Sequence, residues 1–333
     1  QRKLLINYIR GRTWNSTTKS FDFHPRMGDM LHSEPVTVTY DVDYKSKTNK
    51  QVVFAATNEG YLHAFDTITG KELFAFMPKE LLKNIQTLHE NTKGSKHPYG
   101  IDGNLSLWRH DEDGDGKITP STDTATSGDK VYLYFGLRRG GRSYYALDVT
   151  DPKKPQLKWK VTSTDSKFSR LGQSWSTPYL ARVRDSDTGP LKDVLIFTGG
   201  YDTKQDEESL SARNNSDSMG NDVFIVDAHT GEYIWSIQGG KDGNTPITSS
   251  VPPYSSATDL THSIPGGARV LDMNSDGAID RLYFADTKAQ VWRLELPQGP
   301  SYDLDTTKLI KFASLREGRD GETDSQKSRI IYN

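Results

Sequence analysis

Short runs of β-branched and aromatic residues, separated by turns, recur along the chain. Four pairs of such runs are alike, and each pair consists of one apolar run, a turn and a second run. The pairs begin at Val52, Val131, Val194 and Leu282. Side chains of these types fit a pleated, half-buried surface, so each pair predicts two neighbouring β-strands.

A further strand is expected before each pair, and three of the pairs are followed by another. The strands before the pairs are predicted at 35–40, 103–109, 178–184 and 268–272, and those after at 72–77, 157–161 and 233–237. Tight-turn signals at 69–71 and 230–232 join the last two strands of their repeats. Three repeats therefore predict four-stranded antiparallel sheets, and the fourth predicts at least three strands. The best helical candidate is 79–89, whose leucine and isoleucine spacing forms one apolar face.

This repetition favours an all-β fold, a β-propeller with blades of four antiparallel strands. A β-sandwich with chance similarity between hairpins is the alternative. Asp66, Asp148 and Asp227 close equivalent strands and are spaced more widely than the roughly 40–50 residues of a typical blade. Long insertions account for that difference. We expect one domain, or a fragment of it, over 1–333, with blades at 34–78, 100–161, 173–237 and 262–296, and with 297–333 starting a further blade.

The amino-acid composition excludes several functional classes for this chain. The chain of 333 residues has 42 Lys and Arg against 44 Asp and Glu, a net charge of −2, which argues against a general nucleic-acid binder. It has no cysteine, which excludes disulfides, thiolate metal sites and a cysteine nucleophile. No apolar stretch is long enough to predict a membrane-spanning helix. The chain opens without a signal peptide, and we expect it to be a piece of a longer protein.

The clearest chemical signal is the acidic loop at 272–280. Oxygen-bearing side chains occupy positions 1, 3, 5 and 9, namely Asp272, Asn274, Asp276 and Asp280, and glycine occupies position 6. Ala278 at position 7 would contribute its backbone carbonyl. Ca²⁺ takes six to eight oxygen ligands, and this set without cysteine or histidine favours a hard cation over zinc. A solvated, Asp-rich turn is the alternative interpretation.

A second acidic loop begins at Asp111. Its first seven positions match an EF-hand loop, with Asp111, Asp113 and Asp115 at positions 1, 3 and 5, glycine at 6, and the Lys117 carbonyl at 7. Position 12 is not glutamate, and Asp123 is the residue that we expect to close the site. The alternative is a flexible acidic insertion. A third loop at 185–187 lacks a glycine at its sixth position and is interpreted as an ordinary turn.

Other signals favour structural roles. The histidines have no metal-ligand spacing, and no HExxH, GxSxG, P-loop or GxGxxG motif is present. The three acidic loops all lie between the first and second strands of their repeats, so they are expected on one face of a propeller. Any bound cations would then stabilise that face.

Several segments together resemble the C-terminal domain of the PilC/PilY family of type IV pilus-associated proteins. They are Met27-Gly-Asp-Met-Leu-His-Ser-Glu-Pro35, Thr57-Asn-Glu-Gly-Tyr-Leu-His-Ala-Phe-Asp66, Gly100-Ile-Asp-Gly103, and the 272–280 loop followed by Asp286 and Gln290-Val-Trp-Arg293. The match runs in the same order through most of residues 1–300.

The resemblance implies a modified seven-bladed propeller, of which about four blades fall within this chain. It implies Ca²⁺ binding through Asp272, Asn274, Asp276, Ala278 and Asp280, and it does not extend to the loop at Asp111. It further implies a non-enzymatic protein of the cell surface, at the pilus tip or outer membrane. Its partners would be pilus subunits, minor pilins at the pilus tip, and a host-cell receptor. Its roles would be countering pilus retraction, twitching motility and host-cell adhesion.

Two other functions remain open. Ala64-Phe-Asp-Thr-Ile-Thr-Gly-Lys71 resembles blade motifs of quinoprotein dehydrogenases, which use PQQ with Ca²⁺. Several of those enzymes also use a vicinal cysteine pair, which this chain lacks. A Ca²⁺-dependent lectin or receptor-binding module is the other alternative, and it is compatible with adhesion.

Overall fold

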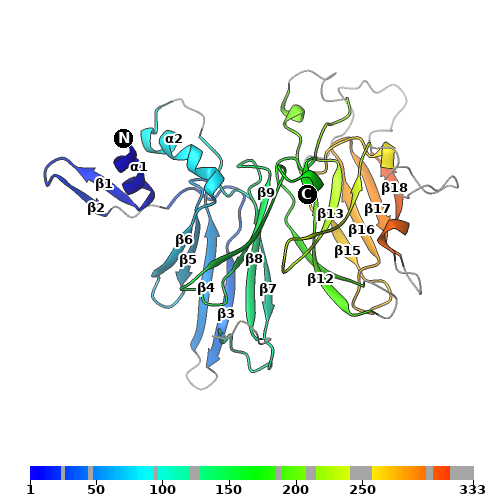
Figure 1. The fold of residues 1–333 in the computed structure, drawn as a ribbon, viewed down its shortest axis with the longest axis horizontal. Helices are drawn as coiled ribbons and strands as arrows, with labels where there is room; N and C mark the ends of the chain where they lie inside the picture. The colour runs from blue at the N-terminus through cyan, green and yellow to red at the C-terminus, as the bar shows by residue number, and fades with distance from the viewer. Residues whose placement is uncertain are drawn as a thin grey trace.

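The computed structural model describes residues 1–23, 27–43, 48–93, 97–120, 128–184, 189–207, 215–240, 257–297 and 303–315. Its strands form four antiparallel sheets of four strands each and one two-stranded hairpin. In every large sheet the strands lie side by side in chain order, as Figure 1 shows. The predicted all-β fold with four-stranded, propeller-type blades is therefore confirmed, and the sandwich alternative is not what forms.

The strand bounds follow the predicted pattern closely. The first sheet contains β3 (Val36–Asp43), β4 (Thr48–Ala56), β5 (Leu62–Asp66) and β6 (Glu72–Phe76). The second contains β7 (Leu105–His110), β8 (Lys130–Gly136), β9 (Ser143–Asp148) and β10 (Gln156–Thr162). The third contains β11 (Tyr179–Arg184), β12 (Leu191–Thr198), β13 (Asp222–Asp227) and β14 (Tyr233–Gln238). The fourth contains β15 (Arg269–Leu271), β16 (Arg281–Ala285), β17 (Gln290–Glu295) and β18 (Lys308–Ser314).

The remaining elements are short. The chain opens with α1 (Arg2–Ile9) and the hairpin of β1 (Arg12–Asn15) and β2 (Ser20–Phe23). The predicted helix over 79–89 is present as two consecutive pieces, the 3₁₀-helix η1 (Lys79–Asn84) and α2 (Ile85–Glu90). Leu81 and Ile85 are its buried residues. Four further 3₁₀ turns are η2 (Ser166–Phe168), η3 (Thr203–Asp206), η4 (Ala257–Asp259) and η5 (Leu304–Thr306).

The fourth sheet corrects one expectation. We expected 297–333 to begin a further blade, but β18 pairs antiparallel with β17 and completes the fourth sheet. The strand was missed because it does not follow β17 after a tight turn like those at 69–71 and 230–232; residues 296–307 separate the two strands. Residues 316–333 lie outside the described residues, so a further blade after β18 stays a prediction.

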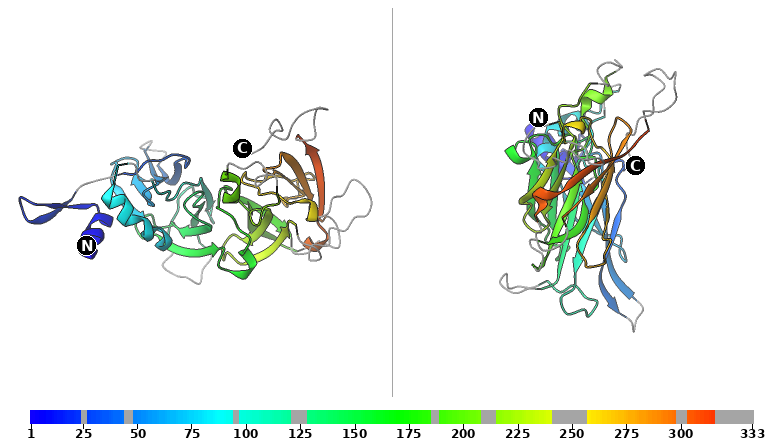
Figure 2. Two further views of the ribbon diagram at one scale, coloured as in Figure 1. Left: turned by 90° about the horizontal axis from the view of Figure 1, so that it is seen from above. Right: turned by 90° about the vertical axis from the view of Figure 1, so that its right-hand side faces the viewer.

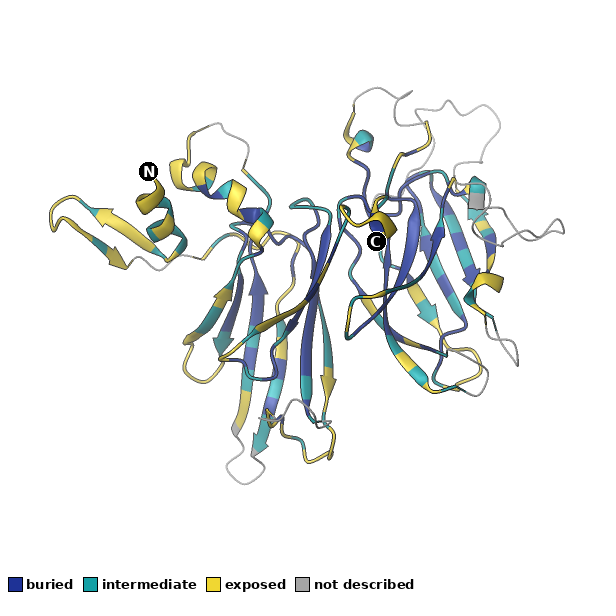
Figure 3. Cartoon of the chain, viewed as in Figure 1, coloured by how far each residue is buried: buried dark blue, intermediate teal, exposed yellow. Residues whose placement is uncertain are grey.

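The sheets follow one another in a curved row, with the N-terminal hairpin at one end and β18 at the other (Figure 2). Each sheet buries its faces against its neighbours, so that three apolar clusters fill the three interfaces. Figure 3 shows the buried residues concentrated along the strands. Representative residues of the successive interfaces are Phe54 with Leu133, Tyr144 with Phe197, and Ile225 with Trp292. Packing between blades is therefore the source of the core.

Polar groups inside these interfaces find partners on the adjacent blade. The Tyr40 hydroxyl on β3 donates to the carbonyl of Val149 in the second blade at 2.6 Å. The Tyr144 hydroxyl on β9 donates to Ser176 O at 3.0 Å, just before the third blade. Because a buried hydroxyl without a partner costs free energy, these bonds also favour one relative placement of the blades.

Glycine permits the closest backbone contacts between blades. A Cβ atom at Gly140 would lie 1.9 Å from the carbonyl oxygen of Gly100. No side chain is compatible with that spacing, so the turn after β8 approaches the segment before β7 only because residue 140 is glycine.

The turn between β16 and β17 contains a fully buried carboxyl group, that of Asp286. Its oxygens accept hydrogen bonds from Trp292 Nε1 at 2.8 Å and from the backbone N–H groups of Lys288 and Gln290. Burial nevertheless raises the pKa of Asp286 from 3.8 to about 6, because desolvation disfavours the carboxylate.

This raised pKa predicts a pH-dependent stability. The folded chain holds the Asp286 proton more tightly than the unfolded chain does, so the contribution of Asp286 to the unfolding free energy falls as the pH rises from about 4 to about 6 and is level above that. Urea unfolding of Asp286→Asn across this range should lack that decline. Asp303→Asn, at an exposed N-cap, should retain it. Equal pH slopes for wild type and Asp286→Asn would contradict the prediction.

Candidate metal sites on the β7–β8 and β15–β16 loops

The loop at 272–280 connects β15 to β16 and is held by its own side chains. Asp272 Oδ2 accepts the Gly277 N–H at 2.9 Å, Asn274 Oδ1 accepts the Asp276 N–H at 3.0 Å, and Asp276 Oδ1 accepts the Ala278 N–H at 2.8 Å. Gly277 has a φ of +89°, a conformation that glycine adopts without strain. These hydrogen bonds fold the loop back on its own acidic and amide side chains.

Asp280, at position 9, closes the loop. One of its oxygens, Oδ2, accepts the backbone N–H groups of Met273 and of Asn274. The other, Oδ1, is buried and has no hydrogen-bond partner, and the residue is only 6% exposed. A buried carboxylate oxygen without a partner is costly, and a cation in the loop would satisfy it.

The preceding blade contacts this loop through Arg184 on β11. Its guanidinium lies 3.4 Å from Asp276 Oδ2 and also donates to the Asp276 carbonyl at 3.3 Å. The pKa of Asp276 is lowered, first by the hydrogen bond from the Ala278 N–H and then by Arg184. The carboxylate that the proposed site needs is therefore the favoured form.

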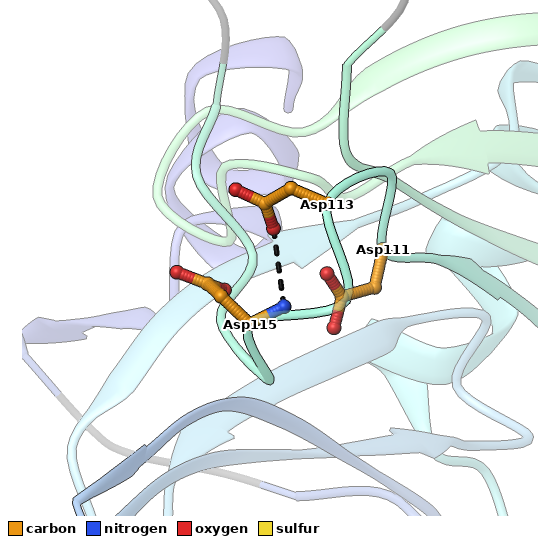
Figure 4. Close-up of side chains that lie close together, drawn as sticks. All are labelled: Asp111, Asp113 and Asp115. Carbon is orange, nitrogen blue, oxygen red and sulfur yellow. Dashed lines mark hydrogen bonds between the residues drawn. The ribbon is translucent and has the colours of Figure 1, made fainter.

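The loop at Asp111, between β7 and β8, repeats the same plan. Asp111 Oδ2 accepts the Gly116 N–H at 3.0 Å, Asp113 Oδ1 accepts the Asp115 N–H at 3.1 Å, and Asp115 Oδ1 accepts the Lys117 N–H at 2.7 Å. Asp111 Oδ1 is buried and has no partner, as is Asp280 Oδ1 in the other loop. Figure 4 shows the three carboxylates around the turn.

The two loops differ in how closely their acids gather. Oxygens of Asp111, Asp113 and Asp115 lie within 4.8 Å of one another. Within the described parts of the chain no other three acidic or histidine side chains meet this closely, so Asp272, Asp276 and Asp280 are further apart. Each loop has one arginine partner, since Arg184 pairs with Asp276 and Arg109 pairs with Asp111 at 3.2 Å.

A residue that anchors the second loop was not singled out in the sequence. Asp129, just before β8, accepts the Glu112 N–H at 2.9 Å and the Thr119 N–H at 2.8 Å. Asp280 makes the corresponding contact with the second residue of its own loop. The pKa of Asp129 is lowered, chiefly by the Thr119 N–H. Asp123, which we expected to close the site, lies outside the described residues.

Position 8 of each loop attaches to the preceding blade. The Ile118 N–H donates to Tyr40 O on β3 at 2.7 Å, and the Ile279 N–H donates to Arg182 O on β11 at 2.9 Å. Both isoleucines are buried in the interface between the two blades concerned. Each loop is thus part of a blade–blade contact, and any change in its conformation is transmitted there.

The donor set suits calcium. The side chains of Asp272, Asn274, Asp276 and Asp280 with the Ala278 carbonyl supply five oxygens, and the orphaned Asp280 Oδ1 is among them. Ca²⁺ takes six to eight oxygens, so one to three positions would be left for water or a ligand. The second loop offers Asp111, Asp113, Asp115 and the Lys117 carbonyl, with Asp129 anchoring the turn.

Two known proteins are similar in sequence to this chain over most of its length. It is 26% identical over 324 residues to a type IV pilus biogenesis factor PilY1 homolog of Xylella fastidiosa, with 88% of this chain and 19% of that protein covered. It is 27% identical over 318 residues to the type IV pilus biogenesis factor PilY1 of Pseudomonas aeruginosa strain PAK, covering 88% of this chain and 23% of that protein. The chain is related to PilY1. The resemblance to the PilC/PilY family is thereby confirmed.

The PilY1 relatives are much longer than this chain, which spans about a fifth of their length. A solved structure, the Pseudomonas aeruginosa PilY1 C-terminal domain, matches with a TM-score of 0.46 and 25% identity, covering 75% of this chain and 39% of that one. No family model matches the chain. No helix in the described part of the chain is long and apolar enough to cross a membrane.

Metal binding at the second loop tests whether Asp129 or Asp123 supports the cation site. In a chain whose first loop is silenced by Asp280→Asn, Asp129→Asn should weaken Tb³⁺ binding about tenfold, because the turn loses two charge-assisted hydrogen bonds. Asp123→Asn should leave the luminescence titration unchanged. The opposite ranking of the two variants would restore Asp123 as the closing residue.

Proposed function

We propose that this chain is a Ca²⁺-binding, non-enzymatic segment of a type IV pilus biogenesis factor. The observation that carries the calcium assignment is the buried, unpartnered Oδ1 of Asp280 at the ninth position of the 272–280 loop. The relation to PilY1 supports the pilus assignment. The second loop at Asp111 is proposed as a further Ca²⁺ site of the same plan.

Calcium in these loops would stabilise contacts between blades. The loops are hydrogen-bonded to the preceding blade at Ile118 and Ile279, so a cation that fixes the loop also fixes that contact. At a concentration 100-fold above the dissociation constant, a cation that binds only the folded chain stabilises it by about 2.7 kcal/mol. Millimolar calcium outside the cell would fill even a modest site.

In the cell we propose a location at the surface, on the pilus tip or the outer membrane. There the protein would contact pilus subunits or minor pilins, counter retraction, and support twitching motility and adhesion to a host-cell receptor. Calcium occupancy would set whether the contact that opposes retraction is made. The chain's similarity to a piece of PilY1 supports this role, and the rest of the longer protein would take part in it.

Metal binding by the first loop is tested by calorimetry and thermal unfolding. In a chain whose second loop is silenced by Asp111→Asn, Ca²⁺ should raise the melting temperature by about 5 °C at 100-fold excess over the dissociation constant. Asp280→Asn should abolish this rise, since Oδ1 is its proposed ligand. Asp259→Asn, which removes a carboxylate outside both loops, serves as the matched control. Unchanged Ca²⁺ affinity in Asp280→Asn would refute the site.

The pilus role is tested in cells that depend on the full-length protein. Asp272→Ala should reduce surface piliation and twitching, and the defect should change with external calcium because the proposed contact requires the occupied loop. If this strain piliates and moves like wild type at every calcium concentration, the regulatory role fails. PQQ absorbance together with dye-linked alcohol oxidation by the purified protein would instead favour the quinoprotein alternative.

A further inference from the structure

A pocket of about 590 Å³ lies between the N-terminal segment and the first blade. Residues at the end of α1, together with Phe23 and Met27, form one wall. Residues of β5 and β6 and of the turns beside these strands form the other wall. The volume is in the range of pockets that bind small ligands. The pocket shares no residue with either acidic loop, so it is a separate candidate site.

The wall that β5 contributes is aromatic. Alternate residues of β5 pack into the interface with the second blade, so Tyr61, His63 and Phe65 lie on the opposite face of the sheet. The ring centroid of His63 lies 5.5 Å from that of Tyr61 and 5.7 Å from that of Phe65. Phe23 adds a further ring from the other wall. Because the faces of aromatic rings attract cations, such walls suit a positively charged ligand with an apolar body.

The charged groups of the pocket also favour a cation. Of the described residues that line it, Glu59 and Glu72 carry carboxylates and Arg10 alone carries a positive charge. Arg10 is exposed at the C-terminal end of α1 and forms no ion pair with either carboxylate. Burial raises the pKa of the Tyr61 hydroxyl, and the charges of Glu59 and Glu72 raise it further. Both carboxylates therefore make the potential at this wall more negative.

His63 contributes a buried hydrogen-bond acceptor. The residue is only 6% exposed, and its Nδ1 lies 2.6 Å from Glu72 Oε1. That carboxylate favours the neutral tautomer with the proton on Nδ1, which leaves a lone pair on Nε2. Nε2 is buried and has no hydrogen-bond partner. A ligand with an N–H group would satisfy this acceptor, which is an indication of a ligand independent of the carboxylates.

We infer that this pocket binds an organic cation, namely an ammonium or guanidinium group carried on an apolar stem. The stem would lie against the rings of Tyr61 and Phe65. The cationic group would donate to the carboxylates of Glu59 and Glu72, and one of its N–H groups would reach Nε2 of His63. A free amine has this chemistry, and so does a lysine or arginine side chain of a partner polypeptide. The inference does not depend on the proposed calcium sites.

The test uses phenethylammonium as the probe, with 2-phenylethanol as its neutral match and 3-phenylpropionate as its anionic match. Binding is measured by calorimetry and by saturation-transfer NMR. The cation should bind about tenfold more tightly than the alcohol, and the anion should bind more weakly than both. Glu59→Gln and Glu72→Gln should each weaken binding of the cation about fivefold, because each loses a charge-assisted contact. His63→Phe keeps a ring but removes Nε2, and it should weaken the cation similarly. Glu232→Gln, at an exposed turn of the third blade, is the matched control and should bind like wild type.

The source of the cation is distinguished by a second pair of probes, N-acetyl-lysine methylamide and its norleucine counterpart. Tighter binding of the lysine amide than of phenethylammonium would support a basic side chain of a partner polypeptide, and the reverse ranking would support a free amine. If the alcohol binds as tightly as the cation, or if Glu72→Gln and Glu232→Gln behave alike, the cation site is refuted. EDTA should change none of these affinities, because the pocket and the acidic loops share no residue.

Discussion

Every feature of this molecule depends on how one blade packs against the next. A four-stranded sheet has two faces, and in the described part of the chain the two middle sheets bury both faces against neighbours while the first and fourth sheets bury one. The tyrosine hydroxyls that donate across the interfaces, and the Gly140 turn that lies against Gly100, then fix the relative position of the sheets. The acidic loops belong to the same system, because Ile118 and Ile279 hydrogen-bond to the first strand of the preceding blade.

The strands were predictable because their signal is local. Alternating β-branched and aromatic residues followed by Gly turns specify a hairpin without reference to the rest of the chain, and the predicted strands of the first three blades lie within a few residues of the observed ones. β18 was not predicted because this local signal is weak there. Residues 296–307 separate it from β17 in place of a tight turn, and part of its apolar surface faces away from the core, with Phe312 being 59% exposed.

The metal loops were predictable only in part. Positions 1, 3, 5 and 7 are close in sequence, so their spacing alone indicates the turns that the structure contains. Asp129, whose carboxylate anchors the second loop, lies well beyond the loop's first acids in the sequence. Asp129 could be recognised only once the start of β8 was seen beside the start of the loop. Arg184 is likewise a neighbour across an interface, and its approach to Asp276 has no signature in the loop sequence.

The two acidic loops lie at different interfaces. The loop at Asp111 contacts the first blade, and the loop at 272–280 contacts the third blade. The middle interface has no such loop sequence; it relies on an aromatic cluster and on Trp159, whose indole N–H donates to Ala228 O at 3.0 Å. In the proposed pilus role the chain would be placed under tension. Bound cations would then oppose separation at the first and third interfaces, whereas the middle interface would depend on side-chain packing and hydrogen bonds.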